Sequence, residues 1–221
     1  MPLSLSEAID VILAHAGEAR HGARVRALRA DFEKRAGAFT PEDPWFDARS
    51  AAFWDDALTT RAFGREVAPL LAEGARFWVE PLARAHRGLF RAKRDKDAHG
   101  ASGFHLVDAW SGAEFRIEAA QGLHDALEQA QGFFDGRVAG GWGEGRAFLG
   151  LLPGAVFHAE EATGAIGDLV ELARARGLER GTFLDALLRM DHTFRGHSRV
   201  KPAFAYRKEL LPGPVPSLPE P

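Results

Sequence analysis

The sequence predicts an α+β fold in which helices precede and follow a small antiparallel β-sheet. Apolar residues recur at three- and four-residue steps in the first and last thirds of the chain, as on one buried face of a helix. Within residues 103–158 they alternate in twos, which is typical of strands with one buried face. The chain has 221 residues, of which 46% are hydrophobic, so we expect one core and a single domain over residues 1–211.

The N-terminal part of the chain is expected to be helical over residues 4–94. Ser4 and Glu7 have the spacing of a capping box, and Gly17 is a natural end for the first helix. Thr40 has the position of an N-cap for a later helix.

Two prolines interrupt the last part of this helical region. Pro69 and Pro81 lie in the stretch from residue 60 to residue 94. Proline lacks the N–H group that a helix interior needs, so this stretch is expected to form two or three helices rather than one.

Residues 103–158 form the predicted β region. Segments 104–110 and 114–118 alternate in twos on either side of a Ser-Gly turn, which predicts a β-hairpin. Segments 133–139 and 146–158 are further strands, joined through a glycine-rich connection, and a proline interrupts the second of them. Four to five short strands can curl into a half-barrel, whose faces the helices must cover.

The chain is expected to end in two helices and a tail. The helices occupy residues 160–196, and Thr182 with Asp185 has the spacing of a capping pair at the start of the second one. Residues 212–221 hold five prolines, which predicts an extended, mobile tail.

Composition excludes several classes of function. The chain has no cysteine, so disulfides, thiolate metal sites and cysteine nucleophiles are ruled out. The N-terminus lacks the features of a secretory signal, and no segment has the length and apolar character of a membrane span. We therefore expect a soluble, cytoplasmic protein with no membrane partner, no cofactor and no metal site.

Three residues are the candidates for catalysis: Asp108, His192 and His197. Strand carboxylates near a turn, such as Asp108, can act as an acid or base, although they more often lie on a solvated face. His192 and His197 are five residues apart, about 500° around a helix, so they do not have the spacing of paired metal ligands. Their alternative role is to complement the helix dipole in a last turn.

Two basic stretches, residues 84–96 and 189–208, are interleaved with aromatic residues. Cations beside exposed aromatic rings are typical of single-stranded nucleic-acid binding, although the net charge of −3 and the lack of a recognisable motif argue against it. The candidate binding residues are Arg87, Arg91, Arg195, Arg199, Lys201 and Arg207.

A cluster of opposite charge lies in residues 42–56, where five acidic residues flank four aromatic ones. One of these rings is a candidate anchor for a protein partner, and the others are expected in the core. Because no assembled catalytic motif accompanies these charges, the leading hypothesis is a non-enzymatic binding or regulatory module with a protein partner. Binding of nucleic acid or a phosphate ligand through the basic stretches is the second hypothesis. An enzyme with dispersed His and carboxylate residues is the third.

Overall fold

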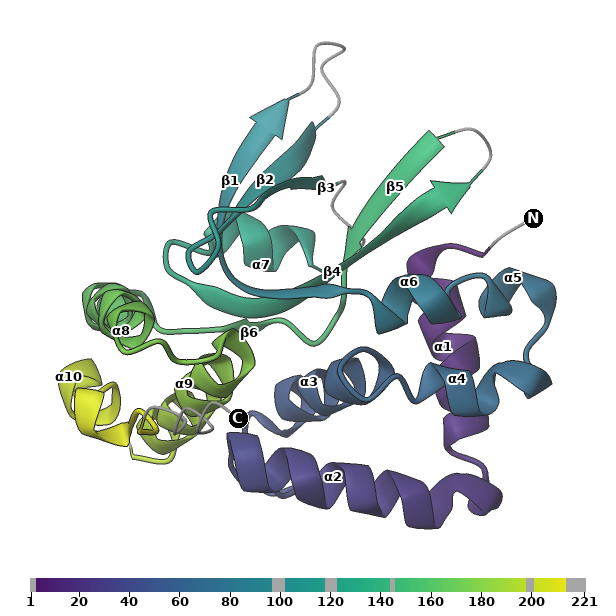
Figure 1. Ribbon diagram of the computed structural model, residues 1–221, viewed down its shortest axis with the longest axis horizontal. Helices are drawn as coiled ribbons and strands as arrows, with labels where there is room; N and C mark the ends of the chain where they lie inside the picture. The colour runs from purple at the N-terminus through teal and green to yellow at the C-terminus, as the bar shows by residue number, and fades with distance from the viewer. Residues whose placement is uncertain (1–2, 97–101, 118–122, 144–145, 198–200, 214–221) are drawn as a thin grey trace, which may run out of the picture.

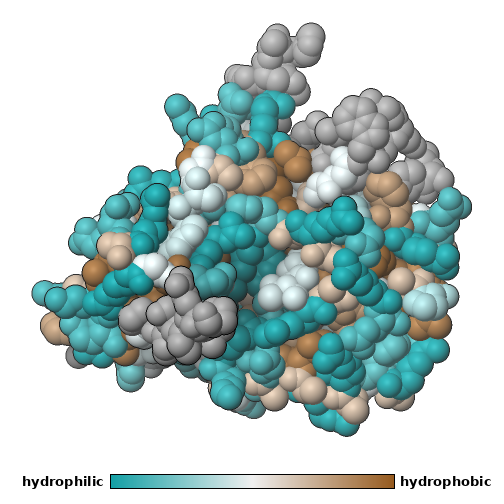
Figure 2. Space-filling view, viewed as in Figure 1, coloured by the Kyte–Doolittle hydropathy of each residue, from teal (hydrophilic) through white to brown (hydrophobic). Residues whose placement is uncertain are grey.

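The computed structural model describes residues 3–96, 102–117, 123–143, 146–197 and 201–213 (Figure 1). Helices, a curved antiparallel sheet and further helices follow one another along the chain, so the predicted α+β class is confirmed. The N-terminal and C-terminal helices lie next to each other on one side of the sheet (Figure 1). Hydrophilic side chains cover most of the face in Figure 2, and hydrophobic ones show as small, separate areas.

The N-terminal helices are short and closely spaced. Ser4 and Glu7 form the predicted capping box, in which each side chain accepts the backbone N–H of the other residue. Pro69 and Pro81 lie in the first turns of short helices, as expected of a residue without an N–H. The elements are α1 (Leu5–Ala16), η1 (Ala19–His21), α2 (Gly22–Ala36), α3 (Phe46–Leu58), α4 (Gly64–Val67), η2 (Ala68–Leu70), α5 (Glu73–Arg76) and α6 (Val79–Ala83).

The predicted antiparallel sheet is confirmed, and in the described part of the chain it has six strands in place of the expected four to five. They are β1 (His86–Lys96), β2 (Ser102–Asp108), β3 (Glu114–Ile117), β4 (Phe134–Gly143), β5 (Arg146–Leu151) and β6 (Val156–Phe157). The order is β3-β2-β1-β4-β5, with β6 paired to the start of β4. The edge strands β3 and β5 approach each other, but no ladder joins their described residues, so the sheet is not closed into a barrel.

The two faces of the sheet pack against different helices. On the inner face, Phe90, Leu106 and Phe134 cluster with Leu127 of α7 (His124–Gln129), which lies within the curve of the sheet (Figure 1). On the outer face, Leu89 packs against the C-terminal helices. Those elements are η3 (Glu160–Ala162), α8 (Thr163–Ala175), α9 (Arg180–Arg195), α10 (Pro202–Ala205) and η4 (Lys208–Leu210). Of the predicted mobile tail, residues 214–221 lie outside the described residues.

The expectation of helix as far as residue 94 is wrong, because the N-terminal helices end with α6 and residues 86–96 form β1. Leu89 and Phe90 are adjacent, yet they are buried on opposite faces, as only a strand allows. The glycine-rich connection is also shorter than predicted, since Gly140 and Gly141 belong to β4 and pair with β5.

Two predicted helix starts are wrong. Thr40 does not begin a helix, because Asp43 accepts its N–H in a turn and α3 begins at Phe46. Thr182 and Asp185 do not cap α9, since the carboxylate of Glu179 accepts the first N–H groups of that helix. Asp185 is therefore available for a different contact, described below.

Candidate functional site

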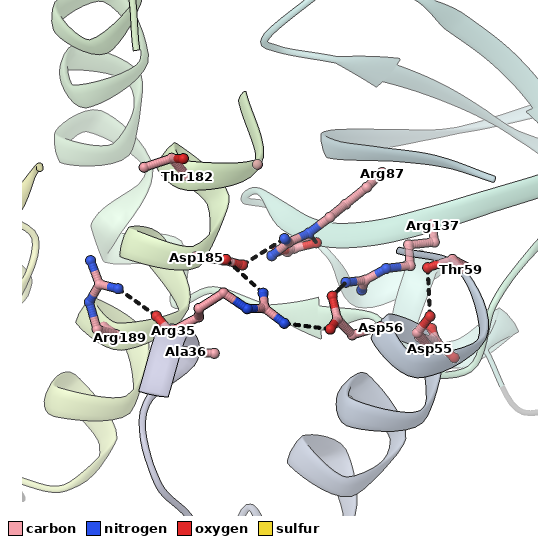
Figure 3. A network of polar contacts seen from close by, with 12 residues as sticks. Arg35, Ala36, Asp55, Asp56, Thr59, Arg87, Arg137, Thr182, Asp185 and Arg189 are labelled. Carbon is pink, nitrogen blue, oxygen red and sulfur yellow. Dashed lines mark hydrogen bonds and ion pairs between the residues drawn. The ribbon is translucent and has the colours of Figure 1, made fainter. Parts of the chain in front are cut away.

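A network of buried ion pairs lies between the outer face of the sheet and the helices (Figure 3). Its centre is Arg87 of β1, which is 9% exposed. The guanidinium donates to both carboxylate oxygens of Asp135 on β4, at 3.2 and 2.7 Å, and to Asp185 of α9 at 2.7 Å. Burial alone would lower the pKa of Arg87, but the two aspartates outweigh it and raise the pKa. Arg87 is thus a permanent cation that ties α9 to the sheet.

The network continues through Arg35 at the end of α2 (Figure 3). Its guanidinium lies between two carboxylates, donating to Asp185 at 2.7 Å and to Asp56 of α3 at 2.6 Å. Asp56 also accepts from Arg137 of β4 at 3.1 Å, so one aspartate joins a helix and a strand. Shared arginine contacts of this kind fix the positions of α2, α3, α9 and β4 relative to one another.

Asp55 is the aspartate of this region whose carboxylate makes a single hydrogen bond among the described residues. It is 1% exposed, and its carboxylate accepts the N–H of Gly154 at 2.9 Å. Burial raises the pKa of Asp55 to about 7, against the opposing charge of Arg137. Four buried aspartates, Asp55, Asp56, Asp135 and Asp185, face three arginines, Arg35, Arg87 and Arg137. A proton on Asp55 therefore brings the charges of this cluster into balance.

A second buried cluster surrounds Asp191 on α9, which is 0% exposed. Its carboxylate accepts from Arg195 at 2.9 Å and from the hydroxyl of Tyr206 at 3.3 Å, and it lies 3.4 Å from Arg49. Burial alone would raise the pKa of Asp191, but hydrogen bonding and the charges of His158, Arg195 and Arg49 lower it to about 2. Asp191 is thus ionised and fully engaged inside the protein.

Asp108, predicted as a catalytic candidate, contacts a histidine, His86, with which the sequence does not predict a pairing. Its buried carboxylate accepts from the N–H groups of Leu89 and Trp110 and from the Ser111 hydroxyl, and it lies 3.0 Å from His86 Nε2. Burial alone would raise the pKa of Asp108, but these hydrogen bonds lower it. The same carboxylate thus closes the β2–β3 turn and orients one imidazole.

The three catalytic candidates do not come together. Asp108 lies 3.9 Å from Arg180 at the start of α9, whereas His192 belongs to the last turn of that helix. Twelve residues of helix separate these two ends, about 18 Å at 1.5 Å per residue. His192 packs edge-on against Trp45, and His197 is exposed beyond the helix. Acid–base partners must reach a common atom, so these residues cannot form one site.

The six predicted binding cations lie in different environments and do not form one surface. Arg87 is buried in the ion-pair network, and the guanidinium of exposed Arg91 lies 4.3 Å from the centre of the Phe133 ring. Arg195 pairs with Asp191, and Lys201 and Arg207 are exposed. Arg199 lies outside the described residues. The first basic stretch is therefore divided between the interior and the surface.

The second basic stretch includes an exposed apolar surface, which we call the C-terminal patch. Phe204 of α10 is 67% exposed and Leu210 is 39% exposed. Both lie in residues 201–210, a segment that also presents three exposed cations and one exposed acid, Glu209. The patch consists of Lys201, Phe204, Arg207, Lys208 and Leu210.

The acidic and aromatic cluster of residues 42–56 is less accessible than the C-terminal patch. Asp55 and Asp56 are buried in the ion-pair network, and Phe53 belongs to the core. Trp45 and Trp54 are half-buried. Two of the five acidic residues and one of the four rings are therefore buried, and the other three rings are half-buried.

One group of side chains has the spacing of metal ligands. The ligand atoms of His124, Asp125 and Glu128 all lie within 4.8 Å of one another. Glu128 is also 2.6 Å from the guanidinium of Arg94, a cation that competes with a metal for this carboxylate. The group therefore offers a weak site at best.

Sequence reasoning missed His86 and Asp185 for identifiable reasons. The segment holding His86 is predicted to be helical, although Phe90 and Ala92 alternate with Arg91 and Lys93 there, a pattern that indicates a strand. Asp185 is assigned to a capping pair on spacing alone. The alternation was an available signal for β1, but the contact of His86 with Asp108 depends on the register of β1 against β2, which alternation does not give.

The comparisons with known proteins add no information on function. No protein-family model matches the chain, and no curated protein or solved structure matches it. Across the described residues, no helix has the length and apolar character that crossing a membrane requires. The function must therefore be argued from the arrangement of the side chains.

Proposed function

We propose that this protein is a non-catalytic binding module that engages an acidic protein partner through the C-terminal patch. The observation that carries the proposal is the exposure of Phe204, at 67%, within a segment whose other exposed residues include three cations. Aromatic residues and arginine are enriched in the energetically dominant parts of protein interfaces. The cations would guide an acidic partner toward the apolar centre of the patch.

The use of charge elsewhere in the molecule supports this proposal. Arg35, Arg87 and Arg137 contact internal carboxylates, so their charge is compensated within the fold. Asp108 and His192 lie too far apart to act together. Lys201, Arg207 and Lys208, in contrast, are exposed.

The partner is expected to be a protein rather than a nucleic acid. Binding of single-stranded nucleic acid rests on several aromatic side chains, on which successive bases stack. In the patch, Phe204 is the ring exposed to solvent, whereas Tyr206 beside it is buried. One exposed ring flanked by Leu210 is better suited to fill an apolar pocket on a protein.

The test compares two matched variants in affinity capture from native lysate. Phe204→Ser removes the exposed ring of the patch, and Leu70→Ser removes an exposed leucine, 36% exposed, from η2 in the N-terminal half. We expect the wild type and Leu70→Ser to capture the same proteins, resistant to nuclease, and Phe204→Ser to lose them. Retention of those proteins by Phe204→Ser overturns the proposal, and loss of all capture after nuclease treatment assigns the patch to nucleic acid.

A further inference from the structure

His86, Asp108 and Arg180 form a partly exposed polar cluster where the start of β1, the end of β2 and the start of α9 meet. The carboxylate of Asp108 is buried, whereas the side chains of His86 and Arg180 are 23% and 34% exposed. His86 and Arg180 are therefore the members of the cluster that a molecule in solution can reach. No residue of the C-terminal patch belongs to this cluster.

Asp108 determines which nitrogen of the imidazole is left for another partner. Its Oδ2 lies 3.0 Å from Nε2 of His86. Burial alone would raise the pKa of Asp108, but its hydrogen bonds lower it, so the carboxylate is ionised and can only accept. Nε2 therefore carries a hydrogen in both the neutral and the protonated form of the imidazole. Nδ1 is an acceptor in the neutral form and a donor in the protonated one.

Arg180 packs against the same imidazole without using Nδ1 in the plane of the ring. Its Nη1 is 3.4 Å from both Nδ1 and Nε2 of His86. A nitrogen in the ring plane at equal distances from these two atoms would collide with Cε1, which lies between them. Nη1 of Arg180 therefore lies over the face of the imidazole, and the in-plane direction of Nδ1 is left to a further partner.

The guanidinium of Arg180 has no close counter-ion among the described residues. Its one ion-pair contact there is with Oδ2 of Asp108, 3.9 Å away, and that oxygen already accepts two shorter hydrogen bonds. The carboxylate of the neighbouring Glu179 accepts the first N–H groups of α9 instead. Arg87, in contrast, has a carboxylate oxygen at 2.7 Å on each of two aspartates. The charge of Arg180 is thus less compensated within the fold than that of Arg87.

Nδ1 of His86 and Nη1 of Arg180 lie 3.4 Å apart, so one oxyanion can contact both side chains. We propose that His86 and Arg180 bind a phosphate group, either inorganic phosphate or a small phosphate monoester. The planar fork of arginine matches the oxygens of such a group. A phosphate gains or loses a proton near neutral pH, as an imidazole does, so a single proton between Nδ1 and a phosphate oxygen satisfies both groups. A carboxylate is ionised at neutral pH and cannot supply that proton.

The probes are inorganic phosphate, phenyl phosphate and acetate, each titrated into the full chain at pH 7 and constant ionic strength. NMR of ¹⁵N-labelled protein follows the ring nitrogens of His86, and isothermal titration calorimetry measures the affinities. We expect both phosphates to shift the Nδ1 resonance and to bind about tenfold more tightly than acetate. Tighter binding of phenyl phosphate identifies a monoester as the ligand, and tighter binding of inorganic phosphate identifies the free ion.

Two variants and a matched control assign the binding to these side chains. Arg180→Gln removes the cation and should weaken phosphate binding about tenfold, because charge-assisted hydrogen bonds are lost. His86→Gln can still donate to Asp108 from the position of Nε2 but has no atom at the position of Nδ1, so it should also bind phosphate more weakly. Arg26→Gln removes an exposed cation of α2 and should bind phosphate as the wild type does. Circular dichroism checks that all three variants are folded.

Three results would overturn the inference. These are the absence of a shift at Nδ1 with either phosphate, binding of acetate as tight as that of the phosphates, and unchanged phosphate binding by folded Arg180→Gln. None of these measurements involves the C-terminal patch, which is tested separately.

Discussion

Two stretches of nearly identical composition, residues 84–96 and 189–208, end in different environments. Each carries six lysines or arginines against one aspartate, with aromatic residues among them. The first becomes β1, whose Arg87 is buried between Asp135 and Asp185. The second becomes the end of α9 and the exposed segment after it, where Lys201 and Arg207 lie on the surface.

The difference shows that a cluster of cations in a sequence does not by itself predict a binding surface. Arg87, Arg91 and Lys93 lie on the same face of β1, because alternate side chains of a strand share a face. Arg87 is buried against Asp185 of α9, whereas Arg91 and Lys93, further along the strand, are exposed. After α9, two short helices leave most side chains of residues 201–210 exposed. Coverage by neighbouring elements thus decides which cations stabilise the fold and which are available to a partner.

The largest expected effect is the loss of stability when Arg87 is removed. Arg87→Met leaves the carboxylates of Asp135 and Asp185 buried without their shared cation, which costs about 3–5 kcal/mol of unfolding free energy. Urea denaturation followed by circular dichroism measures this change as a lower midpoint at constant slope. The matched control is Arg207→Met in the second stretch, where the expected change is within about 0.5 kcal/mol. If the two variants lost equal amounts of unfolding free energy, the proposed difference between a buried first stretch and an exposed second stretch would be wrong.

The next effect concerns Asp108, the catalytic candidate that lies at the end of β2. Asp108→Asn should lower the unfolding free energy by about 1.5–3 kcal/mol, because charge-assisted hydrogen bonds from Ser111 and two backbone N–H groups are weakened. The folded-state pKa of Asp108 is lowered, so its contribution is complete above the ordinary aspartate pKa and disappears as the pH falls through the lowered value. Denaturation at pH 7 and pH 3 should therefore show a large difference between wild type and variant at pH 7 and a smaller one at pH 3. An equal difference at both values would remove the role of the ionised carboxylate.

Much of the fold could be predicted from the sequence because its signals are local. The capping box at Ser4 and the β2–β3 hairpin, whose turn places Gly112 at φ +72°, depend on neighbouring residues alone. The break into short helices at Pro69 and Pro81 follows from the same kind of local rule.

The buried network could not be predicted in the same way. Arg35, Arg87 and Asp185 are up to 150 residues apart, and their contacts exist only once α2, β1 and α9 are packed together. The spacing of Thr182 and Asp185 indicated a local cap, whereas the tertiary contacts of Asp185 with two arginines determine its position. Local rules failed where side chains from distant elements satisfy one another.

Asp55 differs from the other aspartates of the buried network because its pKa is raised. Its pKa is raised to about 7, so between about pH 4 and pH 7 the folded protein holds a proton that the unfolded chain has lost. Stability therefore falls as the pH rises through this window and is level above it. Asp55→Asn carries no charge and can still accept the Gly154 N–H, so its unfolding free energy relative to wild type should rise by about 2–3 kcal/mol from pH 5 to pH 7.5. Identical pH profiles for the two proteins would show that Asp55 is ionised in the fold.

The smallest effect on stability is expected for changes in the C-terminal patch, where the effect on partner binding should be large. In Lys201→Ser with Arg207→Ser, two exposed cations of the C-terminal patch are lost, and the unfolding free energy should change by no more than about 0.5 kcal/mol. Electrostatic attraction between exposed charges is screened by salt, so capture of the acidic partner by the wild type should weaken as ionic strength rises. The double variant should capture less partner at low salt and show little further dependence on salt. If its capture at low salt equals that of the wild type, these cations do not guide the partner, and Phe204 with Leu210 remains as an apolar contact alone.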